Sequence, residues 1–334
     1  MPATRITDVQ RLAPFMGHLR LLGYTTTDQL AGAARVSGEP LARFLNLKPG
    51  DLEDLVRAIP HQEVRFAAAA PASRRLGVRL DRVPRSSRAP LMALGLAAPL
   101  PPKISLIAQM QPVRDQGSRG TCVAHAATAA AEHYWRSQGK TIDLSRQFLY
   151  WACKQNDGHP DEEGTWIGVA MPQLTTTGCC LEHTWPYSMR EIPGNESQGP
   201  PPASALAEAP TYAIPGFREL SPTAVQDIKG ELAEGRCVAF SIPVFNSWYQ
   251  NDEVTRTGEI VNPIPGEGDV GGHAMCFVGY EDQSDAPGLG GGRFYLRNSW
   301  DANWATEPVL GTAGYGTIPY SYIARLGTEA YSIQ

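Results

Sequence analysis

Hydrophobic and polar positions divide the chain into three stretches, and the first of them, residues 1–60, has helical spacing. One helical face follows an i, i+3, i+4, i+7 pattern and consists of Leu52, Leu55, Val56 and Ile59. Thr26 and Gln29 form a capping-box pair, and Asp51 is suited to cap the helix that Pro60 ends. The pattern predicts a small all-α domain at residues 1–60.

Residues 61–102 lose this periodicity. They hold an alanine run, several prolines and seven arginines between Arg65 and Arg88. Prolines at this density interrupt helices and central strands. We expect a linker, or an extended segment that lies on another part of the protein.

Residues 103–334 change from helical to strand-like character. Strong helix formers from Ala126 to Ala131 predict a helix in the first half. Short β-rich runs starting at Cys237, His273 and Arg293 predict strands in the second half. We expect the Pro- and Gly-rich loop 193–215 to join the halves. The order predicts an α+β domain with a groove between its lobes, where ligands commonly bind.

Composition narrows the class of protein. Of 334 residues, 42% are apolar and 19% charged, as in folded soluble proteins. No apolar run is long enough to cross a membrane, and the first residues lack the layout of a secretory signal. Six cysteines are too few for a disulfide scaffold. We therefore expect a cytoplasmic protein with no membrane partner.

The charge is distributed unevenly. Residues 1–102 carry 14 of the 29 Lys and Arg but only 8 of the 34 Asp and Glu, so the rest of the chain is acidic. The basic stretch lacks interleaved aromatic residues, which argues against nucleic acid as a partner. We expect it to dock on the acidic part of its own chain.

The segment from Gln116 to Cys122 carries the first candidate chemistry. A glycine-rich turn delivers Cys122 to the first turn of the predicted helix, where free N–H groups and the helix dipole favour the reactive thiolate. The Gln116 side chain can donate to an oxyanion beside that sulfur. A single cysteine is also commonly a buried structural residue, so this segment alone leaves both interpretations open.

Two later segments favour the chemical interpretation. His273 opens an apolar strand after two glycines, and Asn298 ends the next strand. A thiol, an imidazole that pairs with it and an amide that orients the imidazole form the Cys-His-Asn arrangement for acyl transfer.

With these residues the chain from residue 103 onward resembles the papain-like cysteine peptidases, in a bacterial type with an atypical N-terminal helical extension. His273 follows Cys122 by 151 residues, near the roughly 130–150 of that signature. Further stretches match the family in order, namely Leu144-Ser-Arg-Gln147, Glu163-Gly164-Thr165 with Ala170, Glu182 to Tyr187, Asn298-Ser-Trp300, Trp304 and Gly314-Tyr-Gly316.

The resemblance implies a two-lobed catalytic domain at 103–334, with a helical lobe and a β-barrel-like lobe. It implies proteolysis through an acyl-enzyme on Cys122, without metal or cofactor. His273 would be the base and then the acid, Asn298 would orient it, and Gln116 would form the oxyanion hole with the Cys122 N–H. Trp300 would shield the Asn298–His273 pair and line the leaving-group side.

The resemblance also implies where substrate binds. Gly164 would pair with the substrate backbone as an added strand, with Thr165 and Trp166 beside it. Ala274 would line the pocket for the second residue before the cleaved bond, and Gly120 would also contact substrate.

Three departures from the family stand out. Arg119 replaces a cysteine, which removes a disulfide of secreted relatives, and Val123 replaces a tryptophan. The helical motif of the family's propeptides is absent, so residues 1–102 are not an ordinary propeptide.

Other candidate residues carry weaker signals. Cys179, Cys180 and His183 could suggest zinc, but Cys153, the obvious fourth ligand, is distant in sequence. His125 and His133 are expected to be packing or surface residues. An acidic cluster before Gly164 is either a solvated loop or a selector for basic substrate groups, and it comprises Asp157, Asp161, Glu162 and Glu163.

We therefore predict a thiol endopeptidase that is a zymogen. Residues 61–102 would lie along the groove as an intramolecular inhibitor, and the helical residues 1–60 would anchor them. Its partners would be protein or peptide substrates and its own segment. The same triad also serves amide transfer or deamidation, a relative could bind peptides without cleaving them, and an exopeptidase remains open.

Overall fold

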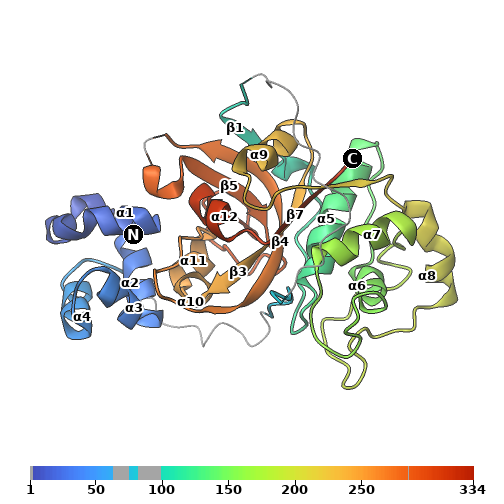
Figure 1. Cartoon of the computed structure of the whole chain (residues 1–334), viewed down its shortest axis with the longest axis horizontal. Helices are drawn as coiled ribbons and strands as arrows, with labels where there is room; N and C mark the ends of the chain where they lie inside the picture. The colour runs from blue at the N-terminus through green and yellow to red at the C-terminus, as the bar shows by residue number, and fades with distance from the viewer. Residues whose placement is uncertain (1–2, 63–74, 82–98, 285) are drawn as a thin grey trace.

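The computed structural model describes residues 3–62, 75–81, 99–284 and 286–334. Figure 1 shows three parts, with α1–α4 at one side, a curved β-rich part in the centre and α5–α8 at the other side. Much of the predicted segment 61–102 lies outside the described residues, including five of its seven arginines.

The N-terminal part is all-helical within residues 3–62, as predicted. Its elements are η1 (Ile6–Asp8), η2 (Gln10–Phe15), α1 (Met16–Leu22), α2 (Thr27–Val36), α3 (Gly38–Phe44) and α4 (Pro49–Arg57). The Thr26–Gln29 capping box opens α2. The predicted cap at Asp51 is wrong, because α4 begins at Pro49 with Lys48 as its N-cap. A proline at the first helical position has the required φ and lacks only an N–H that would be unpaired there.

The helical lobe packs around one central helix. Its elements are α5 (Cys122–Ser137), α6 (Arg146–Lys154), α7 (Ile167–Thr176), α8 (Ala203–Glu208) and η4 (Ala209–Tyr212). Residues 193–215, predicted as a connecting loop, contain α8 and η4, which lie with the helical lobe in Figure 1. The run Ala203–Glu208 is rich in helix formers, and these outweigh the flanking prolines.

The β-rich lobe is built on one antiparallel sheet. Its strands are β1 (Lys103–Ser105), β2 (Phe217–Glu219), β3 (Val238–Phe245), β4 (Asp269–Asp282), β5 (Gly292–Arg297), β6 (Tyr315–Pro319) and β7 (Glu329–Ile333). Their order is β2-β7-β3-β4-β5-β6, and β1 pairs with β4 beyond the end of β3. The remaining elements of this half are η3 (Ile107–Gln109), α9 (Val225–Ala233), α10 (Asn246–Tyr249), α11 (Asp252–Thr257), η5 (Pro287–Leu289) and α12 (Tyr320–Leu326).

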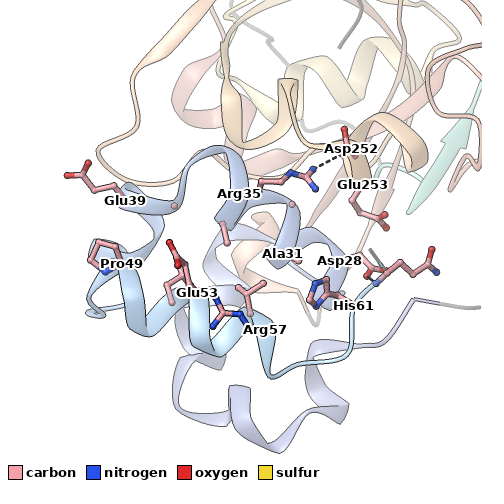
Figure 2. Close-up of a pocket in the computed structure, with 16 residues that line it drawn as sticks. Asp28, Ala31, Arg35, Glu39, Pro49, Glu53, Arg57, His61, Asp252 and Glu253 are labelled. Atoms are coloured by element: carbon pink, nitrogen blue, oxygen red, sulfur yellow. Dashed lines mark hydrogen bonds and ion pairs between the residues drawn. The ribbon is translucent and has the colours of Figure 1, made fainter. Parts of the chain in front are cut away.

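The N-terminal helices dock on the β-rich lobe, on the side away from the helical lobe. Arg35 of α2 forms an ion pair of 2.7 Å with Asp252 of α11 (Figure 2). Gly32 lies so close to Asn251 that a Cβ would come within 2.2 Å of its Oδ1. A cavity of about 790 Å³ between α2, α4 and α11 is lined by none of the predicted site residues.

The two lobes meet along α5, which packs against β3 and β4 as well as against α6 and α7. This packing brings the start of α5 beside the middle of the sheet, where His273 lies on β4 and Asn298 follows β5. The predicted α+β domain with two lobes is therefore confirmed. Among the helices of the described residues, none combines the length and the apolar character needed to cross a bilayer.

Candidate active site

Cys122 is the first residue of α5 and is buried. The turn before it depends on glycine at two points. Gly117 has a φ of +63°, and a Cβ on Gly120 would come within 2.5 Å of the Glu163 side chain. The Ala274 N–H donates to the Cys122 sulfur at 3.4 Å. The sulfur thus lies between the helix start and β4.

His273 and Asn298 form a buried pair. His273 Nε2 lies 2.8 Å from Asn298 Oδ1. The Ser299 N–H also donates to this Oδ1 at 2.8 Å, so the atom is an acceptor and His273 Nε2 carries the proton. His273 Nδ1 has no hydrogen-bond partner among the described residues. The ring therefore keeps an acceptor nitrogen free for a thiol proton.

Trp300 and Gln116 complete the predicted set. The Trp300 ring stacks on His273, with 4.6 Å between ring centroids and an interplanar angle of 20°. The Ser299 hydroxyl donates to Gln116 Oε1 at 2.6 Å, which turns Gln116 Nε2 toward the cleft as the donor. The structure therefore places all four predicted catalytic side chains around one end of α5.

Residues 75–81 occupy this cleft. Gln116 Nε2 donates to the Arg75 carbonyl oxygen at 2.9 Å. Gly77 lies against the nucleophile turn, where a Cβ would come within 2.0 Å of the Gly120 carbonyl oxygen. The Gly77 N–H also points at the Cys122 sulfur. Residues 75–81 of the predicted segment 61–102 thus contact both the oxyanion donor and the nucleophile.

The segment pairs with Thr165 and not with Gly164, the residue that the resemblance implies would pair with a substrate strand. Thr165 N–H donates to the Gly77 carbonyl at 3.0 Å, and the Arg79 N–H donates to the Thr165 carbonyl at 3.2 Å. The backbone of Gly164 is occupied elsewhere, because its N–H donates to the Tyr150 hydroxyl and its carbonyl accepts from Lys154 Nζ. Gly164 instead allows the segment to approach closely, because a Cβ at this position would come within 2.7 Å of the Gly77 carbonyl oxygen. Its φ of +85° also favours glycine.

Val78 bridges the two walls of the cleft. It forms a parallel bridge with Thr165 and an antiparallel bridge with Gly272, to whose carbonyl its N–H donates at 3.0 Å. The carbonyl is one residue before His273 and two before Ala274. The segment is therefore an extra extended strand between the lobes.

Charged side chains hold both ends of the segment. Arg75 lies 3.6 Å from Glu163 and 3.4 Å from Glu191, and Arg79 lies 2.6 Å from Glu162. The Arg79 guanidinium also lies 5.2 Å from the centroid of the Trp166 ring. Segment and catalytic part thus have opposite charges, as predicted.

Asp157 does not belong to the acidic surface that was predicted. Its side chain is fully buried and pairs with Lys154 Nζ at 2.8 Å. Burial of a carboxylate is costly unless it is paired, and Lys154 supplies that partner. The acids that contact the segment are Glu162, Glu163 and the unpredicted Glu191.

Burial sets the protonation of the nucleophile and base. It raises the pKa of the Cys122 thiol to about 12, against the smaller opposite effect of the N–H groups of Ala274, Gly77 and Val123. It lowers the pKa of His273 to about 4. The predicted thiolate is therefore not favoured while residues 75–81 cover the site, because desolvation outweighs the helix start.

Arg119 has a structural role that sequence reasoning missed. Its guanidinium is buried and donates to Gln147 Oε1 at 2.7 Å and to the carbonyls of Ser188 and Glu196 at 2.9 and 3.2 Å. The only signal in the sequence was an arginine at a position where the family has a disulfide cysteine. Arg119 ties the nucleophile turn to the 188–196 loop without a covalent bond.

Apart from the exposed His183, the remaining histidine and cysteine candidates are core residues. His125 is buried, its Nδ1 lies 3.0 Å from the Thr121 carbonyl, and burial lowers its pKa to about 3. His133 is also buried, and its Nε2 lies 3.0 Å from Gln109 Oε1. All six cysteines are buried and free of disulfides.

Comparison with known proteins agrees with this geometry. The family model for papain family cysteine proteases matches residues 103–320. Xylellain, a cysteine protease from Xylella fastidiosa, has a TM-score of 0.62 at 28% identity, over 71% of this chain and 87% of that one. Procathepsin L 3 of Tenebrio molitor shares the fold, with a TM-score of 0.52 at 19% identity over 74% of each chain. An uncharacterized peptidase C1-like protein of Acanthamoeba polyphaga mimivirus is 29% identical over 245 residues, 70% of this chain and 72% of that one.

The chain belongs to the papain family of cysteine proteases. It is a hydrolase with the family's two-lobed α+β fold, preceded by the helical region α1–α4. The family and fold predicted from the sequence are thus confirmed.

Proposed function

We propose that the protein is an endopeptidase whose nucleophile is Cys122. His273 Nδ1 takes the thiol proton as the sulfur attacks the carbonyl carbon of the substrate. Gln116 Nε2 and the Cys122 N–H bind the oxyanion, and His273 returns the proton to the departing amine. Water then hydrolyses the thioester, with His273 again acting as the base.

One observation carries this proposal. The Asn298 oxygen accepts from His273 Nε2, and this leaves Nδ1 as the basic nitrogen beside the helix start that bears Cys122. An amide orients the ring without itself taking a proton, so His273 alone exchanges protons with the thiol and the leaving group.

The catalytic assignment is tested with a fluorogenic peptide blocked at both ends, assayed with the full-length chain carrying Gly77→Ala, in which we expect the cleft to be open. Cys122→Ala should abolish hydrolysis and labelling by a thiol-directed epoxide, whereas Cys153→Ala, at a buried thiol of α6, should retain both. Hydrolysis that survives Cys122→Ala would refute the assignment. Product formation that requires an added amine would favour amide transfer instead, and binding without product would favour a non-enzymatic role.

We also propose that residues 75–81 hold the enzyme latent. Several contacts support this. The oxyanion donor Gln116 is occupied by the Arg75 carbonyl, and the substrate wall at Thr165 is occupied by Gly77 and Arg79. An occupied wall and an occupied oxyanion donor leave no place for a substrate strand. Because the segment is tethered, modest contacts suffice to keep it bound.

The direction of the segment supports its resistance to cleavage. In the family the residues before the cleaved bond lie beside Thr165 and Ala274. Here that place holds Val78 and Arg79, which follow Gly77 in the chain, and the bridge between Val78 and Thr165 is parallel. The backbone therefore runs opposite to a substrate.

A synthetic peptide of residues 75–81 tests this latency directly. Added to a full-length chain in which Gly77→Ala has released the segment, it should inhibit hydrolysis. The inhibition should weaken as salt rises, because exposed ion pairs are screened. The same peptide with Arg75 and Arg79 replaced by glutamine is the control and should inhibit less. Equal or absent inhibition by both peptides would show that the segment is only a linker.

A further inference from the structure

The Arg79 side chain is held by two residues of the catalytic part, Glu162 and Trp166. Only 13% of it is exposed, although its carboxylate partners Glu162 and Asp81 are 60% and 64% exposed. The cover comes from the ring of Trp166, 5.2 Å from the guanidinium carbon. A flat cation over an indole face, with a carboxylate at its edge, is a favourable arrangement for arginine.

The residues that form this site are fixed independently of Arg79. Glu162 uses one oxygen for Arg79 and the other for His159, whose Nδ1 lies 3.0 Å away. The His159 ring packs against Trp166 with 5.8 Å between centroids. The His159 N–H donates to Asp157, which is itself anchored by Lys154. The site therefore does not require Arg79 to assemble.

Its position relative to Cys122 defines a substrate subsite. Val78 is opposite Thr165, the place of the second residue before the cleaved bond, and Arg79 is one residue further from Cys122. Side chains alternate along a strand in either direction, so the residue beyond that position points toward Trp166 in a substrate also. Of the contacts to Arg79, only the one to Asp81 belongs to the segment and would be lost with it.

We propose that Trp166 and Glu162 form a guanidinium subsite that selects substrates with arginine at the third residue before the cleaved bond. This inference rests on the proposed peptidase function. It defines the substrate class as peptides with a small branched apolar residue in the place of Val78, preceded by arginine. Lysine fits less well, because it lacks the flat face that stacks on the indole.

The test compares four end-blocked fluorogenic peptides that differ only in having Arg, Lys, Gln or Glu at the third position before the cleaved bond, with Val at the second. The full-length Gly77→Ala chain, whose cleft is open, is the enzyme. We expect kcat/KM for the Arg peptide to exceed that for the Gln peptide about tenfold, from one stacked and one exposed charge contact. Lys should fall between Arg and Gln, and Glu should be lowest.

Variants of Glu162 and its neighbour Asp161 test whether the preference for arginine depends on Glu162. Glu162→Gln should reduce the kcat/KM advantage of the Arg peptide to about threefold, and Glu162→Arg should make the Glu peptide preferred over the Arg peptide. Asp161→Asn removes a neighbouring negative charge and is the matched control, so it should leave the Arg advantage intact. If Glu162 had a purely structural role, its replacement would instead lower kcat/KM for all four peptides by the same factor.

The outcomes separate the two proposals. Hydrolysis of all four peptides at equal rates would overturn the subsite and leave the peptidase function standing. If no peptide is hydrolysed, epoxide inhibitors with Arg or Gln at the same position report the subsite through the rate of Cys122 labelling. Faster labelling by the Arg epoxide would keep the subsite without hydrolysis, and labelling at equal rates, or none, would overturn it.

Discussion

Arg119 lies three residues before the nucleophile, at a position where relatives with a disulfide have cysteine. Its guanidinium is also placed between two rings, 5.3 Å from the centroid of Tyr150 and 5.2 Å from that of Tyr187. Tyr187 in turn donates its hydroxyl to the Gln116 carbonyl at 2.8 Å. Arg119 and Tyr187 thus hold Gln116, the oxyanion donor, in place. Because no disulfide is involved, this support does not depend on redox conditions.

Replacing Arg119 should therefore destabilise the protein. Arg119→Met leaves the Gln147 oxygen and two carbonyls without their donor, and each buried unpaired group costs about 1–3 kcal/mol. We expect a loss of roughly 3 kcal/mol in the free energy of unfolding, measured by urea denaturation. Arg119→Lys should give an intermediate free energy of unfolding, because lysine retains the charge but lacks the planar guanidinium that donates to several acceptors at once. An unchanged midpoint for Arg119→Met would contradict this role.

Asn298 offers a second prediction for a single residue. Because the amide orients His273 and does not react, Asn298→Ala should lower kcat by about tenfold to a hundredfold and leave KM nearly unchanged. Cys122→Ala should remove activity altogether. Steady-state kinetics of the opened Gly77→Ala chain measure both. If Asn298→Ala has full activity, the His273–Asn298 pair is not part of the mechanism.

At the scale of elements, the N-terminal helices and the segment 75–81 belong to different surfaces of the molecule. The apolar residues of α1–α4 are continuous with the core of the β-rich lobe. The segment adds Val78 to that core but also binds by backbone pairing and charged ends. We infer that the helices anchor the chain while the segment blocks the cleft.

Loosening the anchor should release the segment. Gly32→Ala places a Cβ against Asn251 and should separate α2 from α10 and α11. We expect faster hydrogen exchange in α2 and about tenfold higher peptidase activity than in the unmodified chain. Gly38→Ala, where nothing lies within 4 Å of the new Cβ, is the matched control. Faster exchange without any gain in activity would show that α1–α4 do not contribute to latency.

The elements also show what could be predicted from the sequence. Cys122, His273 and Asn298 each carried a local signal, namely a glycine turn before a helix, an apolar strand and a strand end. The strand start predicted at His273 is wrong, because β4 begins at Asp269. Thr165 was predicted beside the substrate strand, but its backbone pairing with the segment was not predicted, because it depends on where the Gly164 backbone groups find their partners across the lobe.

The segment 61–102 was predicted to lie along the groove, but which of its residues fill the cleft was not predicted, for a related reason. The only signal was a short Leu76-Gly77-Val78 run between arginines within a stretch of alanine and proline. Which of these residues reaches Cys122 depends on register across two lobes. The role of Arg119 depends in the same way on the position of a distant loop.

At the scale of the whole molecule, latency and protonation are linked. In the closed form burial lowers the pKa of His273 to about 4 from an ordinary 6.5. Hydrogen bonds from His159 and then Arg79 lower the pKa of Glu162. On opening, the changes in the pKa values of His273 and of the Cys122 thiol act in opposite directions on proton uptake. The loss of Arg79 raises the pKa of Glu162 toward its ordinary value, so the open form takes up protons there and falling pH favours opening.

Because falling pH favours opening, the activity of the unmodified chain should depend on pH. The ratio of the activity of the unmodified chain to that of the Gly77→Ala chain should rise as pH falls from about 7 to about 4.5, by at most about tenfold per pH unit for each proton taken up. Taking the ratio removes the pH dependence of catalysis itself. A ratio that is constant or falls over this range would contradict the link.

The central claim is that residues 75–81 cover a functional nucleophile, and the labelling rate of Cys122 tests it most directly. A thiol-directed epoxide is added to the full-length chain and to its Gly77→Ala variant, and mass spectrometry follows modification of Cys122. Gly216→Ala, where the new Cβ has open space, is the control. Because a Cβ introduced at Gly77 would collide with the Gly120 backbone, we predict labelling at least about tenfold faster in Gly77→Ala than in the other two chains. Equal rates in all three chains would contradict the account.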